Sequence, residues 1–109
     1  MKKEHFLFLV LVIALTCSSF SQQFGVMTYN IKYDDPYDEI NSWDSRKEWI
    51  VSQIGSRQPG VFGIQEGLKH QLDFLSSQLE SYNYIGVGRD DGQEKGEYSA
   101  IFFDTTKVK

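Results

Sequence analysis

The sequence is constrained most by two short runs of strand-forming residues with an amphipathic helix between them. Residues 24–31 and 60–65 are rich in β-branched and aromatic side chains. Between them, Trp43, Ile50 and Ile54 are spaced as the apolar face of a helix. Two strands joined through a helix favour parallel pairing with a right-handed crossover. The carboxyl ends of both strands are therefore expected at one edge of the same sheet.

A second helix is predicted directly after the second strand. Its apolar residues recur at the period of a single helix face, which indicates core packing: Leu68, Leu72, Leu75 and Leu79. The start of the first helix has two candidate caps, Ser42 and Ser45, and the latter would form a capping box with Glu48. Gly55 and Pro59 are expected to end that helix.

Two further strands are predicted over residues 82–87 and 98–103, with a charged, Gly-rich turn at 88–96 between them. The predicted order is β-α-β-α-β-β, which belongs to the α/β fold class. These elements could build half a sandwich but would leave one face of the sheet with little to cover it. We therefore expect residues 22–109 to be the N-terminal part of a larger, truncated domain.

The first 21 residues have the three-part order of a secretory signal peptide. A short positive opening precedes an apolar run at 6–15, and small polar residues then suit cleavage after Ser21. The run is too short to cross a bilayer as a helix, so no transmembrane span is expected after cleavage. The protein is predicted to be secreted or periplasmic. A lipoprotein acylated at Cys17 is the disfavoured alternative, because the residues just before Cys17 are large.

The charge of the remaining chain bears on its partners. Residues 22–109 carry a net charge of −5, because the −4 of the whole chain includes +1 from Lys2, Lys3 and Glu4. An acidic protein does not hold phosphate groups by long-range attraction. If it acts on phosphate esters, bound cations must supply the positive charge locally. The oligomeric state is left open.

Two polar residues stand where the predicted parallel strands end. Asn30 closes the first strand in T-Y-N-I, and Glu66 closes the second in G-I-Q-E-G. Ligand sites in open α/β sheets form outside such strand ends, so the two side chains are expected to meet. A carboxylate can hold Mg²⁺, and an amide can donate to a phosphate oxygen. From the residues alone, a turn former at Asn30 and a helix-start carboxylate at Glu66 remain the stronger reading.

Four segments in order resemble the endonuclease/exonuclease/phosphatase family, which has the deoxyribonuclease-I-like fold. They are T-Y-N-I, the Trp43-x-x-Arg46 helix start, the Q-E pair ending at Glu66, and G-E-Y-S-A-I-F-F at residues 96–103. The resemblance covers residues 24–109 and leans towards the deadenylase-like and small secreted bacterial branch. It implies a four-layer α/β sandwich that binds a divalent metal, usually Mg²⁺ with Mn²⁺ as the alternative.

The resemblance also implies residue roles. Asn30 is expected in the phosphate and metal shell as a catalytic residue, and Glu66 is expected to be the metal ligand. Glu97 resembles the acidic residue that orients the catalytic histidine in the nuclease branch, although an exposed charge at a strand edge explains it equally well. The family's Gly-Asp-x-Asn and terminal Asp-His motifs do not occur, so this chain alone is not expected to turn over substrate.

Four other features have a plainer explanation. Arg46 is expected to pair with Asp44 or Glu48 rather than with a phosphate, and Arg89 is expected to be an exposed loop residue. His70 is expected to contact Glu66, four residues before it on the helix. The acidic loop, with residues Asp34, Asp35, Asp38 and Glu39, does not have the spacing of an EF-hand and is expected to be solvated.

The sequence thus predicts a phosphate-ester hydrolase, with a Mg²⁺-dependent phosphodiesterase of the nuclease type as the leading hypothesis and nucleic acid as its candidate substrate. A phosphatase or phospholipase of the same family, acting on inositol phosphates or sphingomyelin, is the second. A non-catalytic secreted binding module that kept the scaffold is the third.

Overall fold

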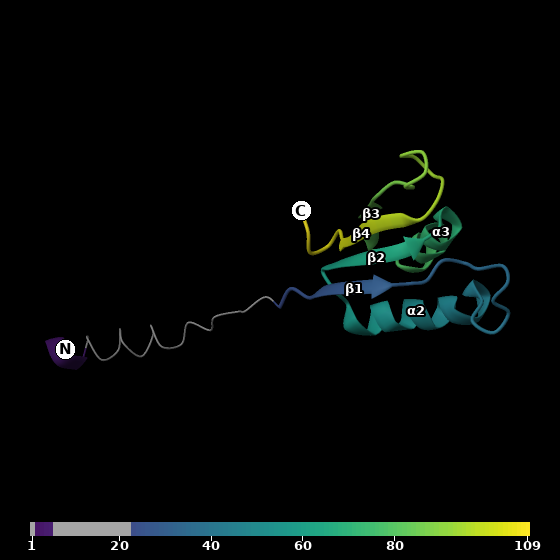
Figure 1. Cartoon of the computed structure of the whole chain (residues 1–109). Helices are drawn as coiled ribbons and strands as arrows, with labels where there is room; N and C mark the ends of the chain where they lie inside the picture. Colours follow the sequence, from purple (N-terminus) through teal and green to yellow (C-terminus); the bar gives the residue numbers. More distant parts are fainter. Residues whose placement is uncertain (1, 6–22) are drawn as a thin grey trace.

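The computed structural model describes residues 2–5 and 23–109 (Figure 1). Most of the predicted signal peptide lies outside these residues, so its assignment, the cleavage site and the lipoprotein alternative at Cys17 stay predictions. Among the described residues, no helix has the length and apolar character needed to cross a membrane.

The described chain forms one four-stranded mixed sheet. Its strands are β1 (Val26–Asn30), β2 (Val61–Gly67), β3 (Tyr82–Ile85) and β4 (Tyr98–Asp104), in the spatial order β1-β2-β4-β3. β1 and β2 pair in parallel, with Asn30 opposite Gln65, while β2–β4 and β3–β4 are antiparallel. The predicted α/β class and the order β-α-β-α-β-β are confirmed.

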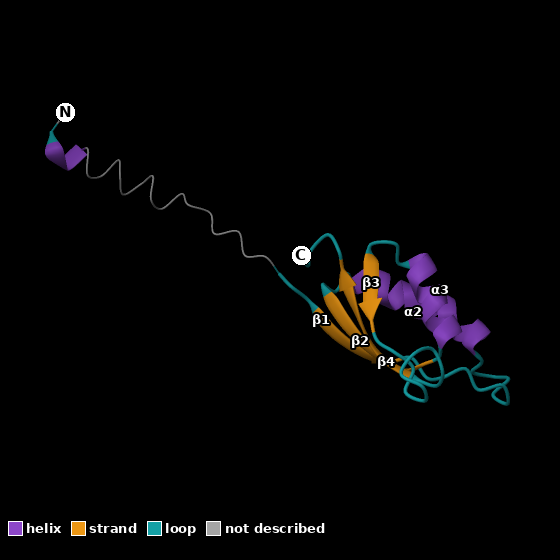
Figure 2. Ribbon diagram, turned by 90° about the horizontal axis from the view of Figure 1, so that it is seen from above, coloured by secondary structure: helices purple, strands orange, loops and turns teal. Residues whose placement is uncertain are grey.

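Two helices, α2 (Trp43–Arg57) and α3 (Lys69–Gln78), lie on the same face of the sheet (Figure 2). The predicted stripes face the core: Trp43, Ile50 and Ile54 of α2 are buried, as are Leu72, Leu75 and Leu79 of the α3 segment. Beneath them, the Phe62 and Phe102 rings stack with their centroids 4.7 Å apart. Hydrophobic burial by this stripe and these rings holds the helical layer on the sheet.

The structure decides how α2 begins and ends. Ser42 is the N-cap, because its side chain accepts a hydrogen bond from the Ser45 backbone N–H at 3.3 Å. The prediction that Gly55 ends the helix is wrong. The helix continues to Arg57 and stops at Gln58, whose left-handed backbone (φ 44°) lets its N–H bond the Ile54 carbonyl.

The opposite face of the sheet is open in the described part of the chain (Figure 2). Side chains alternate along β1 and β4 between the helical layer and this face. Several apolar side chains on the open face are largely exposed, among them Val26 (76%), Ile85 (70%) and Ile101 (53%). The structure therefore has one sheet and one helical layer, which matches part of the expected sandwich.

Candidate active site at the ends of β1 and β2

Asn30 and Glu66 meet at the carboxyl ends of the two parallel strands. The Asn30 side-chain Nδ2 donates a hydrogen bond to Glu66 Oε1 at 2.8 Å, across 36 residues of sequence. Asn30 Oδ1 accepts from the Lys32 backbone N–H at 2.9 Å. The amide thus has its oxygen turned to the backbone and its nitrogen turned to the carboxylate, which fixes which way it points.

A break in the strand pattern directs Glu66 to this position. Strand β2 runs two residues past its predicted end, and its pairing with β4 shifts register between Ile64 and Gly67. Glu66 has a left-handed backbone (φ 62°), and neither Gln65 nor Glu66 is buried, so the in-out alternation stops there. A bulge of this kind re-aims a side chain near a strand end. Here it lets Glu66 reach Asn30, whose side chain is on the open face.

Gly67, the residue after this break, packs closely against core side chains, which a larger residue would have to displace. A Cβ at this position would lie 2.6 Å from Leu72 Cδ1 and 2.8 Å from Ile64 Cδ1. The end of β2 therefore packs directly on the core just after the half-buried side chain of Glu66.

Two long side chains hold the segment that follows β1. Buried Gln71 donates to the Lys32 carbonyl at 3.0 Å and accepts from the backbone N–H groups of Asp34 and Leu68. Arg46 donates to the carbonyls of Ile31 at 2.5 Å and Lys32 at 3.3 Å. The prediction that Arg46 pairs with Asp44 or Glu48 is therefore wrong, because its guanidinium donates hydrogen bonds to backbone carbonyls instead.

Glu97 precedes β4, which pairs with the edge of β2 opposite to β1, so Glu97 and Asn30 lie on different sides of Glu66. Glu97 and Glu66 line a cavity of about 440 Å³ together with Arg89, Ser99 and other residues. The Arg89 guanidinium forms an ion pair with the Glu97 carboxylate, and Arg89 is 70% exposed. Arg89 is thus the exposed loop arginine that was expected, with a carboxylate partner at the cavity wall.

The remaining candidates are separate from the Asn30–Glu66 pair. His70 Nε2 contacts Asp34 Oδ2 at 2.8 Å, so the expected contact with Glu66 is wrong: the bulge turns Glu66 towards Asn30 before the helix begins. In the acidic loop, Asp38 pairs with Lys32 and accepts from the Asn41 N–H. The hydrogen bond from Lys32 lowers the pKa of the Asp38 carboxyl.

The donor set restricts which cation could bind. Among residues 2–5 and 23–109, no three His, Cys, Asp or Glu side chains gather closely enough to hold a metal. Glu66 Oε1 accepts the Asn30 amide, which leaves Oε2 for a ligand. One carboxylate beside an amide suits Mg²⁺, which keeps several waters and commonly takes one or two protein carboxylates plus substrate oxygens. The residues fit that ion and do not form a complete cage.

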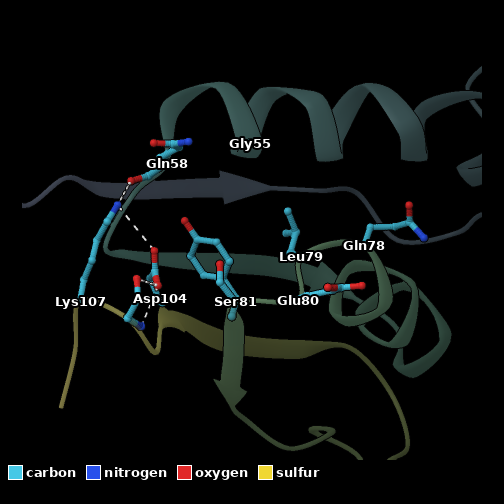
Figure 3. A pocket seen from close by; sticks show the side chains of 10 residues that line it. Gly55, Gln58, Gln78, Leu79, Glu80, Ser81, Asp104 and Lys107 are labelled. Atoms are coloured by element: carbon cyan, nitrogen blue, oxygen red, sulfur yellow. Dashed lines mark hydrogen bonds and ion pairs between the residues drawn. The ribbon is translucent and has the colours of Figure 1, made fainter.

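A second cavity, of about 540 Å³, lies at the opposite end of the sheet (Figure 3). Its polar groups bind one another. Lys107 Nζ donates to the Gln58 carbonyl at 2.8 Å, and Asp104 Oδ1 accepts from the Thr106 N–H and hydroxyl. The Thr106 hydroxyl is the main cause that lowers the pKa of Asp104. These contacts tie the end of β4 to the turn after α2, which is a structural role.

Gln71 was not singled out from the sequence. The signal that could have found it is its place in the α3 stripe, three residues after Leu68 and next to Leu72. A polar residue on the apolar face of a helix is buried, and a buried amide must find partners.

Several known proteins resemble this chain in sequence or in fold. No protein-family model matches the chain. In sequence it is 28% identical over 107 residues to the CCR4-Not complex 3'-5'-exoribonuclease subunit Ccr4 of Mycosarcoma maydis, covering 81% of this chain and 16% of that protein.

Two solved structures resemble this chain both in fold and in sequence. The mannosyl-6-phosphatase Bt3783 of Bacteroides thetaiotaomicron is 38% identical, with a TM-score of 0.74 over 77% of this chain and 32% of that one. An endonuclease/exonuclease/phosphatase from Bacteroides vulgatus is 37% identical, with a TM-score of 0.69 over 74% of this chain and 30% of that one. The chain spans about a third of the length of these structures.

Proposed function

The structural neighbours of this chain are endonuclease/exonuclease/phosphatase family proteins, and an exoribonuclease subunit is its homologue in sequence; on that premise we propose that the whole protein is a metal-dependent hydrolase of phosphate esters. The observation that carries the proposal is the 2.8 Å contact between Asn30 and Glu66 at the ends of two parallel strands. It brings together a carboxylate that could hold a cation and an amide that could donate to a phosphate, at the place where α/β sheets bind ligands.

The chain's own residues would divide the work as follows. Glu66 would hold Mg²⁺, or Mn²⁺, through its carboxylate, while Asn30 keeps that carboxylate oriented. One N–H of Asn30 Nδ2 is used on Glu66, so the second remains to donate to a non-bridging phosphate oxygen. When bound, the cation would polarise the phosphoryl oxygen and stabilise the leaving oxygen.

Glu97 is proposed to act beside this pair, from the wall of the cavity that it shares with Glu66. A carboxylate there could orient a histidine supplied from outside the described residues. Of the histidines that the structure describes, His70 is bonded to Asp34, and neither it nor His5 contacts Asn30, Glu66 or Glu97. The group that activates water is therefore not assigned within residues 2–5 and 23–109.

Two substrate classes are consistent with this site. A nuclease-type phosphodiesterase is favoured by the similarity to an exoribonuclease subunit. A phosphomonoesterase is favoured by the higher identity to a mannosyl-6-phosphatase.

The proposal is tested with Glu66→Gln in the whole protein. We expect Mg²⁺-dependent hydrolysis to fall by about 100-fold or more, because several kcal/mol of transition-state stabilisation depend on the held cation. Glu80→Gln is the matched control, since Glu80 is exposed beside the cavity at the opposite end of the sheet. Full activity in Glu66→Gln would refute the proposed site.

The substrate class is tested on the same protein with single-stranded RNA, mannose 6-phosphate, an inositol phosphate and sphingomyelin. Preference for RNA supports the phosphodiesterase, and preference for a monoester supports the phosphatase. Hydrolysis of none of them, with no binding of Mg²⁺ or Mn²⁺, would favour the non-catalytic binding module.

A further inference from the structure

We propose that Gln71 is a positioning residue for the candidate metal site: it fixes the direction of Asn30 and Glu66 without hydrogen bonding to either. The inference rests on the proposed function, because it assigns a role in metal binding. Gln71 is fully buried in α3, and its three hydrogen bonds go to two backbone segments that leave neighbouring strands.

The first of these segments follows β1 and contains Lys32. The Lys32 backbone is left-handed, with φ 56°, a conformation that residues other than glycine seldom adopt. Its N–H donates to Asn30 Oδ1, while its carbonyl accepts from Gln71 Nε2. Because φ and ψ of Lys32 set the angle between those two groups, the bond from Gln71 contributes to fixing where the N–H points, and hence how the Asn30 amide is turned.

The second segment follows β2 and contains Glu66, whose backbone is also left-handed. Gln71 Oε1 accepts from the Leu68 N–H at 2.9 Å, two residues after Glu66. The strand ladder between β1 and β2 ends where the Ile31 N–H reaches the Gln65 carbonyl at 3.2 Å. Beyond that point, one amide side chain ties both unusual turns to each other.

Arg46 reinforces the same arrangement from α2. Its guanidinium donates to the Ile31 and Lys32 carbonyls, so the Lys32 carbonyl has two donors, one from each helix. A buried side chain that only added stability could bond any nearby backbone. The partners of Gln71 instead lie in the two backbone segments that follow Asn30 and Glu66, the residues proposed to hold phosphate and cation.

The experiment compares Gln71→Met with wild type in the whole protein, by Mn²⁺ titration and by NMR of the Asn30 side-chain amide without metal. Methionine keeps the length of the side chain and removes its donor and acceptor. We expect Mn²⁺ affinity to fall by about 10- to 100-fold, as for other residues that orient metal ligands. We also expect the Asn30 side-chain amide protons to exchange faster with solvent, while the backbone amide proton of Phe62 in β2 stays protected.

Two control variants separate positioning from stability. Gln78→Met changes the same residue type at the exposed end of α3 and should leave both readouts unchanged. Leu75→Ala removes a buried side chain of α3 and lowers stability, yet it should keep Mn²⁺ affinity within about twofold, since it leaves the hydrogen bonds of Gln71 in place.

Unchanged Mn²⁺ affinity in Gln71→Met, or an equal loss in Leu75→Ala, would overturn the inference. If Gln71→Met does not fold, Gln71→Asn replaces it: this variant keeps a neutral amide that is one methylene too short to reach both backbone segments, and an unchanged affinity would again overturn the inference. If wild type itself binds no Mn²⁺, the proposed function fails, and unchanged exchange of the Asn30 amide in the metal-free variant then decides against Gln71 separately.

Discussion

At the scale of single residues, the candidate site depends on backbone conformations that are uncommon for their side chains. Lys32 and Glu66 are both left-handed, and they lie just beyond the last hydrogen bond between β1 and β2. Each costs of the order of 1 kcal/mol relative to an ordinary conformation, and packing elsewhere must offset it. Outliers of this kind cluster at functional sites, which agrees with the proposal for Asn30 and Glu66.

Lys32 provides a direct test of this strain. Lys32→Gly and Lys32→Ala both lose the ion pair with Asp38, so they differ only in backbone freedom and the added methyl. We expect the glycine variant to be more stable by about 1 kcal/mol, because glycine adopts a positive φ without a Cβ clash. Urea unfolding of the two variants measures the difference.

The same pair of substitutions at Glu48, an exposed residue inside α2, should give the opposite order. There alanine is favoured over glycine by roughly 1 kcal/mol, because glycine is a poor helix former. An alanine variant at position 32 as stable as the glycine variant would contradict the reading of Lys32 as strained.

At the scale of elements, the turn that follows β4 is stabilised by the charged carboxylate of Asp104. Asp104 accepts two hydrogen bonds from Thr106 and lies near Lys107 (Figure 3). These contacts favour the ionised carboxyl and lower its pKa in the folded state. Its stabilising contribution is therefore fully present above the unfolded-state pKa, of about 3.9, and is lost as the pH falls through the lower folded-state pKa.

Asp104→Asn tests this pH dependence. The variant should be less stable than wild type at pH 7, and the difference should shrink as the pH is lowered below about 4. Thermal unfolding at several pH values measures it. Glu80→Gln, at an exposed residue of the same cavity, should show no such trend. A constant difference between wild type and Asp104→Asn at every pH would rule out the carboxylate as its source.

Most of the arrangement of strands and helices could be predicted from the sequence. The alternation of strands and helices, the α3 stripe and the meeting of Asn30 with Glu66 all depend on periodicity and on one parallel crossover. The bulge at Glu66, the Gln71 hydrogen bonds and the partner of His70 do not. They depend on which backbone groups remain unpaired after the strands and helices have packed, and no local pattern carries that information.

At the scale of the whole molecule, the described chain leaves one sheet face without a covering layer. Rows of neighbouring residues run across this face through the paired strands: Val26, Val61 and Phe103, and then Thr28, Gly63, Ile101 and Ile85. An exposed apolar face of this kind marks a contact surface. This chain covers about a third of its solved relatives, and further chain in such proteins is available to pack on a face of this kind.

Residues 23–109 produced alone should therefore self-associate through the open face. Ile101→Lys should raise the monomer fraction in size-exclusion chromatography with light scattering, because it places a charge at the centre of the face. Ile40→Lys is the control, since Ile40 is 86% exposed in the loop between β1 and α2. Equal effects of both variants would show that added charge, rather than the sheet face, governs association.

The contact between Asn30 and Glu66 and the bonds made by Gln71 all fall within one continuous stretch, residues 30–71. Arg89 and Glu97, which line the adjoining cavity, both come from the loop between β3 and β4. Insertions between β3 and β4 would therefore reshape one wall of the cavity, while the Asn30–Glu66 contact and the hydrogen bonds of Gln71, all within residues 30–71, would stay in place.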